Sequence, residues 1–242
     1  MGLCLHKGAK SVSVDQLYAV KTPAPTETHY PLPHHVVRNI VVNHILDSGL
    51  DIEDEHHGLW SPKGGTGNDR YFGLFNIIGD TDDFRFVVGV RNSHDKRFSA
   101  GACSGSRVFV CDNLAFSGEH VLKRKHTRFV AQDFAQLVRD LPLRQLADGE
   151  TKRIAAYKET ELTDVQLHDL AIRSVDDGVL PASKLPELLT QWRTPNHPEF
   201  RDRNVWSAFN AYTEVLKGTS LERLSGRTQR LHSLVLPLCQ SA

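Results

Sequence analysis

Three short apolar runs stand close together in the first half of the chain. They are YFGLFNII at residues 71–78, FRFVVGV at 84–90 and RVFV at 107–110, and clusters of Gly, Asp, Asn and Ser separate them. Runs of this length that are rich in Phe and Val and end in turn residues are typical of strands joined by hairpins. The pattern predicts turns at residues 79–82 and 92–95.

The segment from Phe98 to Ser106 has Ala, Gly, Cys or Ser at nearly every position. Small residues in a strand leave room for a ligand or another backbone to come close. We therefore predict a curved antiparallel sheet of about four strands over residues 71–112, in which one strand is made of small residues.

The segments before the predicted sheet have other patterns. Residues 1–33 are polar and end in several prolines, which indicates an arm and a linker. Apolar residues at helical spacing predict one helix over about residues 32–48. Residues 51–69 are acidic, contain histidine and glycine, and are interpreted as a loop that includes Trp60.

Helical periodicity dominates after Gly118. Thr127 is expected to cap a long helix that runs to about residue 160 with a kink at Pro142. Further helices are predicted to begin near Thr163, Lys184, Asn204 and Ser220, and a glycine at position 218 to end one of them.

Strands in the first half and helices in the second, without βαβ alternation, indicate an α+β fold. The expected domains are an arm at residues 1–33, an α+β core at 34–160 that includes the long helix, and a helical region at 161–242 packed on this core.

Composition adds mainly exclusions. The 242 residues include 29 Lys and Arg against 29 Asp and Glu, so the formal net charge is +0 and no overall field attracts nucleic acid or membrane. The four cysteines lack the paired short spacing of a zinc site and are expected to be reduced thiols. Neither a signal peptide nor an apolar run of membrane-spanning length is found, which predicts a cytoplasmic protein.

The candidate chemistry is a local concentration of positive charge. If the turn near residue 94 folds back toward the segment before the long helix, the cations of both form one strip for the phosphates of a single-stranded nucleic acid. Tyr71, Phe72, Phe84 and Phe98 are available to stack on bases. The candidate nucleic-acid-binding residues are Arg91, Lys96, Arg97, Arg107, Lys123, Arg124, Lys125 and Arg128.

Other chemistries have weaker patterns. His56 and His57 are metal-ligand types, but neighbours on one loop rarely bind one ion, so no metal and no cofactor is expected. Cys111, with His94 or His120 as a base, is a candidate nucleophile that a buried cysteine at a strand end explains as well. A hydrolase would need clustered carboxylates, and only the turn with Asp80, Asp82 and Asp83 offers several together. The pattern favours a protein without catalysis.

The second turn and the strand after it resemble a known family. The residues that carry the likeness are Arg91, Asn92, Ser93, Asp95, Arg107, Val108, Cys111 and Asn113, and the helix that begins at Asn204 is similar too. They resemble the phage- and plasmid-borne family called domain of unknown function number 932, over about residues 35–235. The resemblance implies a mobile-element lineage in a bacterial host cell and no particular activity.

The order of helix, strands, basic segment and long helix is also similar in layout to phage single-strand annealing proteins of the Red-beta, RecT and Erf kind. That resemblance implies a homo-oligomer that binds single-stranded DNA in recombination. We therefore expect a non-enzymatic protein that binds single-stranded nucleic acid. The alternative is a host-defence antagonist that binds a host protein or sequesters a nucleotide signal, for which a pocket lined by Arg91, Ser104, Ser106 and Arg107 would be the sign.

Overall fold

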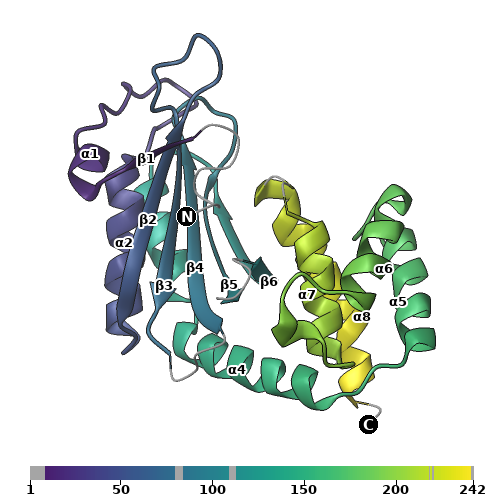
Figure 1. Cartoon of the computed structure of the whole chain (residues 1–242). Helices are drawn as coiled ribbons and strands as arrows, with labels where there is room; N and C mark the ends of the chain where they lie inside the picture. Colours follow the sequence, from purple (N-terminus) through teal and green to yellow (C-terminus); the bar gives the residue numbers. More distant parts are fainter. Residues whose placement is uncertain (1–8, 80–83, 109–112, 218, 220, 241–242) are drawn as a thin grey trace. The chain divides into compact units, whose positions relative to one another are not determined.

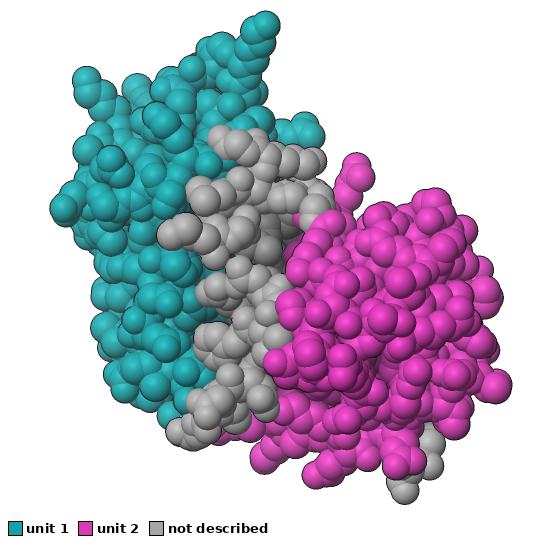
Figure 2. Space-filling model, viewed as in Figure 1, with its two compact units in different colours: residues 1–81, 85–105, 120–146 teal, residues 82–84, 106–119, 147–242 magenta. Residues whose placement is uncertain are grey.

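The chain folds into two compact units. A computed structural model describes residues 9–79, 84–108, 113–217, 219 and 221–240. One unit contains residues 1–81, 85–105 and 120–146, and the other contains residues 82–84, 106–119 and 147–242 (Figure 2). We call them the sheet unit and the helical unit. Over the described ranges, no helix is both long and apolar enough to cross a membrane.

Six strands form one open sheet in which each strand lies beside the next one in sequence (Figure 1). The registers of β1 on β2, β2 on β3 and β3 on β4 are antiparallel. The α+β class and the antiparallel sheet are thereby confirmed, with six strands where about four were predicted. The strands are β1 (Lys10–Val12), β2 (Ile52–Trp60), β3 (Arg70–Ile77), β4 (Phe84–Ser93), β5 (Ala100–Val108) and β6 (Asn113–Arg124).

The first half of the segment interpreted as an acidic loop over residues 51–69 is strand β2, whereas residues 61–69 form neither helix nor strand. Its polar side chains find partners on neighbouring elements: Glu53 accepts from Nε of Arg85 at 2.9 Å and Glu55 accepts from Nε of Arg38 at 2.9 Å. These partners are far away in the sequence, so β2 is stabilised by contacts that its own composition does not reveal.

The small residues expected to form one strand lie in β5, and β6 then extends to Arg124, beyond the point where helical periodicity was expected to begin. Residues 109–112, the end of the RVFV run and its turn, lie outside the described residues. A Cβ on Gly101 would come within 2.9 Å of the Leu122 carbonyl oxygen. Because real Cβ atoms avoid this distance, glycine is what lets β6 approach β5 here.

Three helices belong entirely to the sheet unit: α1 (Val14–Tyr18), α2 (His34–Asp47) and α3 (Val130–Arg139). The predicted helix over residues 32–48 corresponds to α2, and the Arg38–Glu55 pair places it against the sheet. Its Val37, Val41 and Ile45 are buried, and α3 packs beside it.

The single long helix predicted from Thr127 to about residue 160 is wrong. The chain forms α3 and a separate α4 (Leu143–Glu159), with Pro142 between them. Proline has no amide hydrogen and disfavours helical backbone in the residue before it, so the interruption is a full break. The residue that precedes α3 is Phe129, without a side-chain cap, and Thr127 does not serve as the cap.

The core of the helical unit is formed mainly by α4 and the helices that follow it, and it includes Phe84 at the start of β4. Two N-cap predictions are confirmed, because Thr163 and Asn204 accept hydrogen bonds from the amides of Gln166 and Ser207. Gly218 lies outside the described residues. The helices are α5 (Asp164–Asp176), α6 (Leu185–Arg193), α7 (Val205–Val215) and α8 (Leu221–Gln240), with short 3-10 turns η1 (Ala182–Lys184) and η2 (Pro198–Phe200).

Helix α7 is the centre of this unit. Val205, Phe209 and Tyr212, together with Leu216 at the end of the helix, are buried, with at most 1% of each residue exposed. Asn204 also donates through Nδ2 to the carbonyl of Lys158 at 3.1 Å, so one side chain both caps α7 and ties it to the end of α4.

Replacing Asn204 with Ala should lower the free energy of unfolding by about 1–2 kcal/mol, because the cap acceptor and the tie to α4 are lost together. Asn204→Ser keeps a cap acceptor and should recover part of this loss. Urea unfolding monitored by circular dichroism measures both. Equal stability of wild type and Asn204→Ala would contradict this role.

Candidate nucleic-acid interface

One face of the sheet carries arginines and aromatic rings in alternation. Side chains on a strand point to opposite faces in turn, and residues paired across two strands share a face. The register places Trp60 opposite Arg70, and Phe72 opposite Arg91. Phe98, in the turn between β4 and β5, joins them. We call these five residues, Trp60, Arg70, Phe72, Arg91 and Phe98, the arginine–aromatic face.

The five side chains contact one another. The guanidinium of Arg70 lies 4.5 Å from the ring centre of Trp60 and 6.0 Å from that of Phe98. The guanidinium of Arg91 lies 5.1 Å from Phe98, whose ring is 5.6 Å from Phe72. All five are half-buried. Each such cation–π contact contributes about 0.5–2 kcal/mol, so the guanidinium groups are held in fixed positions on the sheet.

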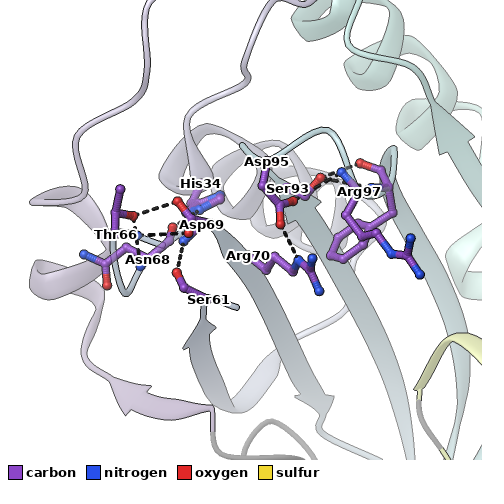
Figure 3. Close-up of polar contacts among 10 residues, drawn as sticks. His34, Ser61, Thr66, Asn68, Asp69, Arg70, Ser93, Asp95 and Arg97 are labelled. Atoms are coloured by element: carbon purple, nitrogen blue, oxygen red, sulfur yellow. Dashed lines mark hydrogen bonds and ion pairs between the residues drawn. The ribbon is translucent and has the colours of Figure 1, made fainter. Parts of the chain in front are cut away.

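In addition to its ring contacts, the guanidinium of Arg70 is bound by a carboxylate. Nε of Arg70 donates to Asp95 at 2.7 Å, and the other Asp95 oxygen accepts from the backbone amide of Arg97 at 3.2 Å (Figure 3). Ser93 accepts from the Phe98 amide at 3.1 Å and donates to the Phe98 carbonyl at 2.7 Å, which fixes the turn. Between them Lys96 has φ 63°, a left-handed conformation that leaves it exposed at the tip.

The turn with Lys96 and Arg97 lies near the end of β6. The close approach of β6 to the start of β5 shows this: a Cβ on Gly101 would lie 2.9 Å from the Leu122 carbonyl oxygen and 3.4 Å from Nε of Arg91. The charge of Lys96 also reaches His29, whose ring contacts that of His126 at 4.8 Å. The turn and residues 123–128 therefore lie toward the same end of the sheet unit.

The eight predicted residues are not equivalent. Lys96, Arg97, Lys123 and Lys125 are exposed, and none pairs with a carboxylate of the described residues. Arg124 is paired with Asp133 of α3 through Nε at 2.9 Å, which neutralises it. Arg128, also exposed, lies 6.0 Å from the Phe129 ring. The side chain of Arg107 is outside the described set.

The aromatic candidates divide into two groups. Tyr71 and Phe84 are core residues, 0% and 5% exposed, so their availability for stacking was a wrong prediction. Phe72 and Phe98 lie on the arginine–aromatic face. Sequence reasoning missed Arg70 and Trp60, because their pairing appears only when residues 52–60 are recognised as a strand aligned with β3.

The alternative chemistries find little support in the described residues. His56 and His57 are neighbours on β2 and so point to opposite faces, where they contact Asp54 and Tyr71 at 3.1 and 3.0 Å. No group of three metal-ligand side chains gathers anywhere in the described part of the chain. The Cys111 hypothesis and the acidic turn at residues 80–83 lie outside the described residues.

The geometry defines an α+β protein whose antiparallel sheet displays fixed arginines between aromatic rings. The family model described as Domain of unknown function (DUF932) matches residues 69–235, and the chain belongs to this family. The match includes Arg70, Arg91 and Phe98, whereas Trp60 lies before it. No curated protein and no solved structure matches the chain significantly.

Cys103 of β5 should be unreactive at pH 8. Burial raises the pKa of its thiol to about 12, against the opposing effects of the Arg91 charge and of the Gly89 backbone. Thiol, not thiolate, therefore predominates until strongly basic pH. Alkylation by iodoacetamide, followed by mass spectrometry of the Cys103 peptide, should be slow in the folded protein and fast in urea. Equally fast labelling of both would contradict this.

Proposed function

We propose that this protein binds single-stranded nucleic acid along the arginine–aromatic face, without catalysing a reaction. The observation that supports the proposal is the contact of Arg70 and Arg91 with the rings of Trp60 and Phe98. Unpaired bases stack on aromatic rings and on guanidinium planes, and phosphates bind cations beside them.

The lysines beside the arginine–aromatic face are suited to the same ligand. Lys96 is exposed two residues before the half-buried Phe98, and Lys123 is exposed next to Leu122, whose carbonyl oxygen lies beside Gly101 of β5. With a formal net charge of +0, the protein has no general attraction for polyanions, so this local concentration would have to provide the affinity. Half-buried aromatic rings favour single strands over duplex, because the bases of a duplex are already stacked.

We further propose that several copies assemble on one strand and anneal complementary strands, as the likeness in layout to phage annealing proteins implies. A phage or plasmid origin and a bacterial cytoplasmic location belong to the same proposal. The mass of the complex with a long oligonucleotide and an annealing assay with two complementary strands measure these parts separately.

Fluorescence anisotropy with labelled single-stranded DNA, duplex DNA and RNA at about 50 and 200 mM salt tests binding. We expect a preference for single strands and a fall in log K of about 0.7 per phosphate contacted for each tenfold rise in salt. Absence of binding to all three ligands would reject the proposal, and the host-defence antagonist would then be the favoured function.

Variants locate the interface. Arg91→Met keeps the aliphatic stem and Phe98→Leu keeps an apolar side chain, and each should weaken binding about tenfold or more, since one stacking contact contributes about 1–3 kcal/mol. Lys123→Glu with Lys125→Glu should weaken it further and reduce the salt dependence. Arg139→Met on α3 and Lys152→Glu on α4 are the matched controls and should bind as wild type. Equal effects of sites and controls would exclude this face.

Asp95→Asn should tighten binding several-fold. The variant removes the negative charge that now pairs with Arg70, while the amide oxygen still accepts from the Arg97 backbone. Asp140→Asn makes the same charge change at the end of α3 and is the control. If both variants bind equally more tightly than wild type, the change in net charge alone explains the effect. If neither binds more tightly, Arg70 does not contact phosphate.

A further inference from the structure

A buried group of imidazoles lies behind the arginine–aromatic face, on the side of the sheet that α2 covers. His29 precedes α2, His34 begins it, His94 follows β4, and His126 follows β6. At most 7% of each of these residues is exposed, and Asn92 between them is fully buried. We call these five residues the histidine cluster.

Asn92 connects the cluster through all of its side-chain polar atoms. Its Nδ2 donates to the Leu32 carbonyl at 2.6 Å and to Nδ1 of His34 at 2.9 Å. Its Oδ1 accepts from Nε2 of His126 at 2.8 Å. Nε2 of His34 donates to the Asn68 carbonyl at 3.0 Å, so His34 is neutral with its proton on Nε2.

The remaining rings complete the arrangement. Nε2 of His94 donates to the same Leu32 carbonyl at 3.0 Å, and its ring stacks on that of His34 with centres 3.8 Å apart and planes at 5°. The ring of His29 meets His126 edge-on. A neutral cluster therefore has its hydrogen bonds satisfied at Asn92, His34 and Leu32.

Burial explains why the rings are neutral. It lowers the pKa of His34 to about 3, and the neighbouring His94 acts in the same direction. It lowers the pKa of His126 to about 4, with His29 as the next cause. Folding thus favours the unprotonated rings, and protonation costs free energy as the pH falls below about 6.5, the ordinary pKa of histidine.

Charged groups around the cluster modify this cost without removing it. Burial is the largest cause of the lowered pKa of His94, and the Asp69 and Asp95 carboxylates oppose it. Lys96 lowers the pKa of His29, second to burial. Tyr71, whose ring lies 5.5 Å from that of His34, is the neighbour on β3.

We propose that the histidine cluster is a pH-operated latch, in which neutral imidazoles hold residues 29–34 on the sheet and protonation releases them. A proton on Nδ1 of His34 would face the amide hydrogens of Asn92, donor against donor. Rotating the Asn92 amide would not relieve this, because its oxygen would then face the Leu32 carbonyl and lose the proton donated by His126. Two cationic rings stacked at 3.8 Å would also repel each other.

Release is expected to be local. Residues 20–33 form neither helix nor strand, so no backbone ladder holds them in place. The backbone amide of Tyr30 donates to the His126 carbonyl at 2.9 Å, and the Leu32 carbonyl accepts from Asn92 and His94. When the cluster loses these bonds, the segment loses its polar attachments while the β2–β3–β4 ladder remains. The latch does not depend on nucleic-acid binding.

Amide hydrogen exchange of the free full-length protein between about pH 7 and about pH 2.5 is the test, with imidazole nitrogen resonances reporting protonation of each ring. After correction for the intrinsic pH dependence, the Tyr30 amide should exchange at least about tenfold faster once the rings are protonated, while amides of β3 stay protected. Protonation without faster Tyr30 exchange would overturn the latch. An equal increase in the exchange rates of the β3 amides would mean global acid unfolding and would overturn the latch too.

Asn92→Asp tests the geometry itself. A carboxylate at this position accepts from protonated His34 and from His126, so the pKa of His34 should rise and release should require a lower pH, or should vanish above about pH 4. Asn68→Asp introduces the same charge on an exposed side chain nearby and should release as wild type does. Identical release in both variants would overturn the role of Asn92. If Asn92→Asp fails to fold, the wild-type exchange measurement decides alone.

Discussion

The alternation of side chains at the end of β4 is the constraint on which most of the sheet unit depends. Arg91 and Asn92 are neighbours in sequence and point to opposite faces. Arg91 contacts Phe98 on the proposed interface, and Asn92 connects the buried imidazoles behind it. A shift of one residue in the register of β4 would bury a guanidinium and expose the amide, so both arrangements require one register.

The same strand end explains why charge and burial meet here. Ser93 fixes the turn that carries Lys96 and Phe98, and the next residue, His94, returns to the buried side. Of these four consecutive residues, Arg91 lies on the proposed interface, Asn92 and His94 are buried in the core, and Ser93 binds the turn. The family match begins just before β3 and includes this whole strand, in agreement with the residues that carry the sequence resemblance.

The elements that could be predicted from the sequence are those marked by signals between residues close together in the chain. The apolar runs gave β3 and β4, and side-chain caps marked the starts of α5 and α7, because these features depend on residues a few positions apart. Strand β2 was missed since its acidic residues are balanced by Arg38 and Arg85, which only the fold brings near. The cations of the candidate site could be identified from their clustering, whereas Arg70 with Trp60 and the histidine cluster come from segments that the chain alone does not align.

The shortness of β1 has a consequence for the tendency of the folded protein to aggregate. Its three residues pair with only His57 to Leu59 of the longer β2. On the side away from β3, the first part of β2 therefore pairs with no strand of the described chain, and it carries Glu53, Asp54 and Glu55. A row of acidic side chains on an open edge discourages pairing with a second copy, so these residues protect the chain against aggregation as well as forming ion pairs.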